Sequence, residues 1–250
     1  MDEPSVAIIT GASSGIGRQT AMLLAERGTR VVLVGRRRDE LDKTAGMLAG
    51  QGHRVYPADL SEHTTGEHTT AGALIKTVRE EFGRLDVLVN NAGLARLGPL
   101  SEGVSAQDIH EHVMINTIAP ALLVAAAWPL MLEGQGACLV NVSSMSTIDP
   151  FPGLFAYALS KAGLNVMLKS CINEGESRVR AFGIAPGCVE TPMLRGLFDQ
   201  RQVPPEIAIT PRDAAMLVVE CIDGQWDEAN GGVISILKED DEVVRRVVER

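Results

Sequence analysis

Tyr157 and Lys161 lie four residues apart in the stretch Y-A-L-S-K, and this pair of side chains is suited to moving a proton. Residues at i and i+4 share one face of a helix. An ammonium group beside a phenol favours the phenolate and lowers the phenol pKa from about 10. A tyrosine placed in this way can give or take a proton near neutral pH. On these five residues alone, a half-buried tyrosine beside a surface lysine remains an alternative.

A glycine-rich stretch, T-G-A-S-S-G-I-G at residues 10–17, joins a predicted strand to a predicted helix. Its glycines, spaced G-x-x-x-G-x-G, are Gly11, Gly15 and Gly17. Glycines permit a tight turn and let a pyrophosphate approach the backbone, while the helix N-terminus supplies N–H donors. Ser13 and Ser14 add hydroxyl groups. The stretch therefore predicts a phosphate-binding loop, with a plain strand–turn–helix connection as the alternative.

The end of the second predicted strand carries the run G-R-R-R, Gly35 to Arg38. NAD sites usually have an acidic residue here, which binds the ribose 2′-hydroxyl. No carboxylate is present to repel a 2′-phosphate, and a guanidinium is well shaped to bind one. The sequence therefore predicts NADP (NADPH) in preference to NAD, with Arg36 as the first contact and Arg37 as the second. A solvated basic turn is the alternative.

Apolar runs alternate with helical patterns along the chain. Strands are predicted at 6–10, 30–34, 53–59, 85–90, 137–143, 179–185 and 231–237. Helices are predicted at 16–27, 41–49, 71–82, 107–132 and 156–172. This alternation predicts an α/β fold with a parallel sheet covered on both faces, in which fully buried strands appear as continuous apolar runs. With no repeat, linker or second core, one dinucleotide-binding and catalytic domain is expected over residues 1–250.

Three other segments stand apart from this pattern. Residues 61–70 are polar and aperiodic, and predict a surface loop. Residues 193–210 contain Pro204 and Pro205 and predict a lid over the substrate, since long loops of compact domains are often lids. A C-terminal helical tail is expected at 239–250, where valines recur at helical spacing as Val243, Val244, Val247 and Val248.

The charge balance argues against several kinds of partner. The net charge is −9, and the only basic run is the short one at 36–38, so nucleic acid is not expected. The acidic start M-D-E-P-S predicts no signal peptide. The apolar run at 118–132 contains two prolines and is short for a bilayer, which predicts a buried helix and no membrane partner.

Cysteine and histidine spacing indicates neither disulfides nor a metal site. The four cysteines form no C-x-x-C pair, which is typical of reduced thiols and a cytoplasmic location. The H-E-H run, His110 to His112, does not match H-E-x-x-H. These histidines, with His63 and His68, are expected to be solvated, and no metal is predicted.

Several motifs together resemble the short-chain dehydrogenase/reductase family. They are T-G-A-S-S-G-I-G, N-N-A-G at 90–93, Asn116, the set Ser144, Tyr157 and Lys161, and A-P-G-C-V-E-T-P-M at 185–193. The resemblance covers about residues 5–193 and is specific, because separate motifs occur in the family's order. It weakens after Thr191, where family members differ by substrate.

The resemblance implies a Rossmann-type doubly wound sheet of about seven parallel strands with helices on both faces. By position it implies that Tyr157 is the catalytic acid/base, Lys161 lowers its pKa, Ser144 orients the substrate oxygen and Asn116 holds a water in a proton relay. The cofactor would contact Gly11, Ser13, Ser14, Gly15, Ile16, Gly17, Arg36, Arg37, Asp59, Leu60, Asn90, Ala92, Gly93, Tyr157, Lys161, Pro186, Gly187, Val189 and Thr191.

The expected function is an NADP-dependent dehydrogenase/reductase of the EC 1.1.1 type, which interconverts a carbonyl and an alcohol. An apolar or medium-sized substrate is expected from the pocket candidates Leu94, Met145, Phe151, Phe155, Met193, Leu197 and Phe198. The resemblance also implies a homodimer or homotetramer built on the long helix after Gln107 and the helix of Tyr157. A dehydratase or epimerase, and an NADP-sensing binding protein, remain as alternative functions.

Overall fold

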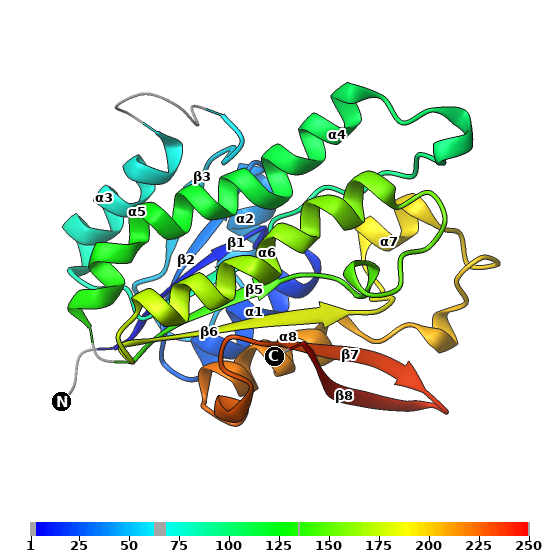
Figure 1. Ribbon diagram of the computed structural model, residues 1–250. Coiled ribbons are helices and arrows are strands. Elements are labelled where there is room, and N and C mark those ends of the chain that lie inside the picture. The colour runs from blue at the N-terminus through cyan, green and yellow to red at the C-terminus, as the bar shows by residue number, and fades with distance from the viewer. Residues whose placement is uncertain (1–3, 63–68, 135, 250) are drawn as a thin grey trace.

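Eight strands form one sheet in the computed structural model, which describes residues 4–62, 69–134 and 136–249 (Figure 1). The order across the sheet is β3-β2-β1-β4-β5-β6-β7-β8. The strands are β1 (Val6–Thr10), β2 (Arg30–Gly35), β3 (Arg54–Pro57), β4 (Val87–Asn90), β5 (Ala137–Val142), β6 (Val179–Pro186), β7 (Val233–Glu239) and β8 (Glu242–Glu249). Strands β1 to β7 pair in parallel, and β8 pairs antiparallel to β7. The expected Rossmann-type sheet is confirmed, with eight strands in place of about seven.

Helices cover both faces of the sheet, as a doubly wound fold requires. The α-helices are α1 (Gly15–Glu26), α2 (Arg38–Ala45), α3 (Thr70–Phe82), α4 (Ala106–Val113), α5 (Ala119–Glu133), α6 (Phe155–Glu174), α7 (Pro192–Leu197) and α8 (Pro211–Ile222). One core packs α1, α2 and α8 against the sheet, and a second packs α3, α5 and α6 against the opposite face. Figure 1 shows α5 and α6 over one face, with α1 and α8 beyond the sheet.

The central strands are buried on both sides, which accounts for their continuous apolar sequences. In β1, Ala7 and Ile9 belong to the first core, whereas Val6 and Ile8 belong to the second. Successive side chains of a strand point to opposite faces, so each face needs its own apolar set. The V-A-I-I-T run is long enough to supply both.

The long helical region after Gln107 is interrupted. A π-helical turn, Met114–Ile118, separates α4 from α5. Pro120 lacks the N–H that would bind the carbonyl of Asn116 in an α-helix, and π turns often occur at functional positions. Among the described helices, the continuous stretch Ala106–Glu133 is long and apolar enough to cross a membrane by length and composition. Leu123 and Leu130 of this stretch are buried and belong to the second core, and 39% of the apolar window is buried.

The C-terminal segment is a strand, so the prediction of a helical tail at 239–250 is wrong for its described part. Asp240 and Asp241 both have positive φ, 47° and 65°, and make the two-residue turn that returns the chain along β7. Val243 and Val247 pack against the first core. They lie four residues apart, a spacing that fits both a strand and a helix. The segment forms a strand because it can pair with the otherwise unpaired edge of β7.

Two further segments differ from expectation or lie outside the described residues. Residues 211–222 form α8, to which the sequence pattern assigned no element. The expected surface loop at 61–70 falls largely on residues 63–68, which lie outside the described residues, and α3 begins at Thr70.

Candidate active site

A cavity of about 430 Å³ opens at the carboxyl ends of the parallel strands. Open α/β sheets bind ligands at this edge, near the point where the strand order reverses. Here that point lies between β1 and β4. The predicted residues that line the cavity are Gly11, Ser13, Ser14, Gly15, Ile16, Arg36, Arg37, Asp59, Leu60, Asn90, Ala92, Gly93, Ser144, Tyr157, Lys161, Pro186, Gly187, Val189 and Thr191. The cavity lining thus contains all the residues predicted for catalysis and cofactor binding except Gly17 and Asn116, which are buried outside it.

The glycine loop presents the start of α1 to the cavity. Gly11 and Gly15 have φ of 65° and 55°, which glycine adopts without strain. A Cβ on Gly17 would lie 2.5 Å from the Gly11 carbonyl oxygen, so the turn closes only around glycine. No side chain caps the helix at Ser14, and no acidic residue lies in its first turn. The first N–H groups therefore face the cavity with the positive end of the helix dipole, an arrangement that fits an anionic diphosphate.

Thr10 and Asn91 tie this loop to the segment after β4. The Thr10 hydroxyl accepts the backbone N–H groups of Asn91 and Ala92, each at 2.9 Å. The Asn91 side chain donates to the Thr10 carbonyl at 2.8 Å. Both residues line the cavity although neither was predicted as a site residue. Thr10 and Asn91 belong to the motifs T-G-A-S-S-G-I-G and N-N-A-G. Their hydrogen bonds, which hold the two loops together, depend on the fold and could not be predicted from the motifs.

The basic end of the cavity lies after β2. Arg36 is exposed and approaches Asp59, with Nη1 3.7 Å from Oδ2. Arg37 donates to the Ser13 hydroxyl at 3.3 Å, which places a second guanidinium beside the glycine loop. The Asp59 carboxylate also accepts the Ser61 N–H and hydroxyl, at 3.0 and 2.6 Å. One guanidinium thus lies beside the held Asp59 carboxylate and a second beside the glycine loop, at the end of the cavity where a nucleotide ribose and base would lie.

Tyr157, Lys161 and Ser144 line the opposite end of the cavity. Tyr157 and Lys161 occupy successive turns of α6, and Ser144 follows β5, where its hydroxyl accepts the Ser146 N–H at 3.1 Å. The Lys161 ammonium is buried and donates to the Val142 carbonyl at 2.8 Å. It lies 6.0 Å from the centroid of the Tyr157 ring.

The pKa values of this pair shift in directions that burial explains. Burial lowers the pKa of Lys161 from 10.5 to about 8, because the cavity wall disfavours its charge. Burial raises the pKa of Tyr157 above 10.0, and the hydrogen bond with Ser144 opposes this only in part. The raised pKa of Tyr157 reflects desolvation of the phenolate, and the lowering effect expected from Lys161 stays a prediction.

Asn116 lies behind the cavity wall in the π turn and is fully buried. Its Oδ1 accepts the Leu94 N–H and its Nδ2 donates to the Leu94 carbonyl, both at 2.8 Å. A Cβ on Gly93 would lie 3.1 Å from Asn116 Oδ1 and 3.3 Å from Lys161 Nζ. The amide and the ammonium therefore both pack against the face of Gly93, which leaves little room for a larger residue.

The segment after β6 closes the cavity. Val189 pairs with Ile209, and the Glu190 N–H donates to the Ile209 carbonyl at 2.9 Å. The two ends of the predicted lid at 193–210 are thus held together by backbone pairing, and the lid contains part of α7. Arg195 pairs with Glu190 and donates to the Val203 carbonyl at 2.8 Å, which ties the two limbs of this segment together.

The substrate end of the cavity is mostly apolar. Among the predicted pocket residues, those in the lining are Leu94, Met145, Phe151, Met193, Leu197 and Phe198. The rings of Phe151 and Phe198 approach with centroids 6.0 Å apart. Phe155 does not line the cavity and is 42% exposed, contrary to expectation.

Polar groups that the sequence did not single out also reach this end. Ser143 and Ser146 line the cavity, and their buried hydroxyls have no hydrogen-bond partner among the described residues. Asp149 lies exposed at the rim.

One of the histidines expected to be solvated is buried. His112 is 1% exposed, whereas His110 is exposed. His63 and His68 lie outside the described residues. In the described part of the chain no group of three or more His, Cys, Asp or Glu side chains is placed to hold a metal ion.

Comparisons with known proteins agree with this architecture. A short chain dehydrogenase from Pseudocercospora fijiensis is 37% identical over 192 residues, which cover 74% of this chain and 60% of that protein. The 3-oxoacyl-[acyl-carrier-protein] reductase FabG of Thermotoga maritima is 30% identical over 244 residues, which cover 94% of this chain and 96% of the relative.

Solved structures share the fold across nearly the whole chain. A 3-ketoacyl-(acyl-carrier-protein) reductase from Brucella melitensis, complexed with NADH, has a TM-score of 0.85 at 25% identity, covering 96% of this chain and 99% of its own. A short chain dehydrogenase from Shigella flexneri 2a, complexed with NADP, has a TM-score of 0.81 at 28% identity, covering 92% and 96%. The profile of the short chain dehydrogenase family matches residues 5–202. The chain therefore belongs to the short-chain dehydrogenase/reductase family of oxidoreductases.

Proposed function

We propose that this protein is an NADP-dependent oxidoreductase that interconverts a carbonyl and an alcohol by hydride transfer, with Tyr157 as the acid/base. The observation that carries the proposal is one cavity, lined at one end by the uncapped glycine loop and at the other by Ser144, Tyr157 and Lys161. A bound nicotinamide supplies the hydride, so the chain has to place a carbonyl and protonate its oxygen.

The Tyr157 hydroxyl is the proposed proton donor. Its raised pKa keeps the phenol protonated at neutral pH, which suits donation during carbonyl reduction. Ser144 and Tyr157 together offer hydrogen bonds to the negative charge that develops on the substrate oxygen. Lys161, with a pKa of about 8, is mainly cationic at neutral pH and stabilises a phenolate once the proton has left.

The choice of NADP rests on the guanidinium groups after β2. Arg36 and Arg37 line the cavity, whereas neighbouring Arg38 pairs with Asp42 on the surface of α2 and does not. Guanidinium binds phosphate in bidentate fashion. Of the two structural relatives, one is complexed with NADH and the other with NADP, so the fold is compatible with either nucleotide.

An apolar or medium-sized carbonyl substrate is proposed from the lining of the substrate end, where Met193, Leu197 and Phe198 close over the cavity. A panel in which sugars are reduced well and apolar ketones are ignored would rule this out.

A homodimer or homotetramer is proposed because apolar side chains of the α5–α6 region lie exposed. Ile118, Leu159 and Val166 are 36%, 49% and 69% exposed. Sedimentation as a stable monomer at micromolar concentration would contradict this.

A cytoplasmic location is proposed from the unpaired thiols of the four cysteines.

The decisive experiment follows NADPH absorbance against a panel of carbonyl compounds. Wild-type protein should consume NADPH with at least one apolar ketone or aldehyde, and Tyr157→Phe should lose about 10²- to 10⁴-fold in kcat because the general acid is gone. Substrate conversion without net loss of NADPH would favour a dehydratase or epimerase. Tight NADPH binding with no conversion across the panel would favour a sensor.

A further inference from the structure

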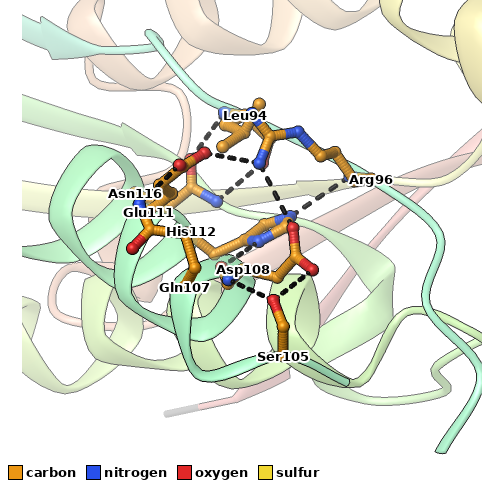
Figure 2. Close-up of polar contacts among 8 residues, drawn as sticks. All are labelled: Leu94, Arg96, Ser105, Gln107, Asp108, Glu111, His112 and Asn116. Carbon is orange, nitrogen blue, oxygen red and sulfur yellow. Dashed lines mark hydrogen bonds and ion pairs between the residues drawn. The ribbon is translucent and has the colours of Figure 1, made fainter. Parts of the chain in front are cut away.

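One wall of the cavity is an extended segment held by side chains of the neighbouring helix. Leu94 and Ala95 line the cavity directly after the N-N-A-G motif. Asn116 makes two hydrogen bonds to the Leu94 backbone. Two residues further on, the Arg96 N–H donates to Nε2 of His112 at 3.1 Å. Figure 2 shows Asn116 and His112, one helical turn apart, facing this segment.

The hydrogen-bond partners of His112 indicate which ring nitrogen carries the hydrogen. Nδ1 lies 2.7 Å from the Asp108 carbonyl oxygen, which only accepts, so Nδ1 must carry the hydrogen. Nε2 faces the Arg96 N–H, which only donates, so Nε2 must keep its lone pair. Both bonds exist together only in the neutral imidazole with its proton on Nδ1. A buried polar side chain with both ring nitrogens satisfied is a rigid support.

The same imidazole also touches the proposed acid/base. The rings of His112 and Tyr157 meet edge to face, with centroids 6.5 Å apart and planes at 73°. This is a favoured geometry for aromatic pairs. One buried side chain therefore contacts the wall that faces the substrate and the ring that carries the proposed proton.

The ion pairs around Arg96 do not replace this support. Its guanidinium reaches Asp108 and Glu111 on α4, but all three side chains are partly solvent-accessible, between 32% and 48% exposed. Exposed ion pairs contribute little to rigidity or stability. The hydrogen bond from the Arg96 N–H to the buried His112 ring is the contact that holds the Arg96 backbone.

We propose that His112 is a positioning residue for the carbonyl–alcohol reaction. Its imidazole holds the Leu94–Arg96 wall against α4 and packs edge to face on the Tyr157 ring, without touching substrate or cofactor. The inference rests on the proposed function. It assigns His112 to the substrate end of the cavity, so its loss should affect the carbonyl substrate and leave the nucleotide site unchanged.

The test compares His112→Phe, which keeps an aromatic ring but removes the Nε2 acceptor and the Nδ1–H donor, with His112→Gln, whose amide oxygen extends about as far as Nε2. His112→Phe should lower kcat/KM for the carbonyl about 5- to 10-fold, as expected for one lost hydrogen bond in an active-site wall. The dissociation constant for NADPH, measured by fluorescence, should stay within about two-fold, and His112→Gln should recover most of the loss. Glu111→Gln, which removes the charge that pairs with the Arg96 guanidinium and keeps an amide oxygen to accept from Gln107, is the matched control and should behave as wild type.

Three results would overturn the inference while leaving the proposed function intact. The first is an active wild type and an unchanged kcat/KM in His112→Phe. The second is an equal loss of kcat/KM in His112→Phe and His112→Gln. The third is an increase in the NADPH dissociation constant of His112→Phe as large as its loss of kcat/KM for the carbonyl. Nitrogen-15 NMR gives a readout independent of activity. A signal that is absent from His112→Phe should show the Nδ1–H tautomer, and the Nε2–H tautomer would contradict the assignment. A wild type without any carbonyl turnover would overturn the proposed function and this inference together.

Discussion

Replacing Lys161 by methionine should alter the pH dependence of stability in a way that can be calculated from the structure. Lys161 is 3% exposed, and burial lowers the pKa of its ammonium from 10.5 to about 8 on folding. Between these two values the unfolded chain binds the proton and the folded chain does not. Stability therefore rises with pH through this window, and it is lowest below about pH 8, where the folded protein has to bury the charge.

The size of the effect follows from the shift. A difference of about 2.5 pKa units corresponds to about 3 kcal/mol of cost at low pH. Between about pH 7 and pH 9.5 the two-state linkage relation recovers about 2 kcal/mol of this cost. Methionine has similar length and no charge, so Lys161→Met should lack this recovery. The lost hydrogen bond to Val142 adds an offset of about 1 kcal/mol that changes little with pH.

The assay is urea unfolding of wild type and Lys161→Met across this pH range. The difference in free energy of unfolding is the quantity of interest, because the two proteins share their other titrating groups, including buried thiols such as Cys138. The wild type should gain about 2 kcal/mol relative to Lys161→Met as the pH rises from about 7 to 9.5. Lys169→Met, an exposed change on the same helix, should show no such trend. A flat difference for Lys161→Met would refute the claim that burial lowers this pKa.

Three other changes test the loops and the nucleotide site. Thr10→Val leaves two backbone N–H groups without their acceptor and should lower the free energy of unfolding by about 2–4 kcal/mol, with Thr10→Ser close to wild type in thermal melts. Arg36→Ala should weaken NADPH about 10- to 100-fold and NADH much less, whereas Arg38→Ala should change neither; equal losses for both nucleotides in titration calorimetry would remove the 2′-phosphate assignment. Gly17→Ala places a Cβ 2.5 Å from the Gly11 carbonyl oxygen, so nucleotide binding should fall at least about tenfold, and unchanged binding would show that the loop adapts.

The strand and helix order was predictable because both faces of the sheet are covered. Runs such as V-A-I-I-T are apolar throughout, and no exposed face dilutes the pattern. The end of the chain was mispredicted because Val243 and Val247 satisfy the helical and the strand period at once. The helix α8 was missed although Thr210 and Asp213 form a complete capping box before an apolar pattern, with Pro211 at its first turn.

The candidate site was predictable where motif residues themselves face the cavity. What the sequence did not reveal depends on burial. The pKa of Tyr157 rises in the structure because desolvation outweighs other effects, and desolvation is set by packing around the ring. His112 was expected in solvent, but it faces inward from α4. The N–H that its Nε2 accepts belongs to Arg96, sixteen residues away in the sequence, and its ring packs on Tyr157 of α6.

The hairpin of β7 and β8 bears on how the protein can be handled. Val233, Ile234 and Ile236 of β7 are buried, and β8 satisfies the hydrogen-bonding groups along that border. Truncation of the chain after Asp240 would leave β7 as an apolar edge strand with unpaired N–H and C=O groups. Such an edge can pair with a strand of another molecule and cause aggregation. Arg246 and Glu242, exposed on the outer strand, discourage such stacking in the intact chain. Purification tags are therefore better attached to the amino end, and a truncated product should be expected to precipitate.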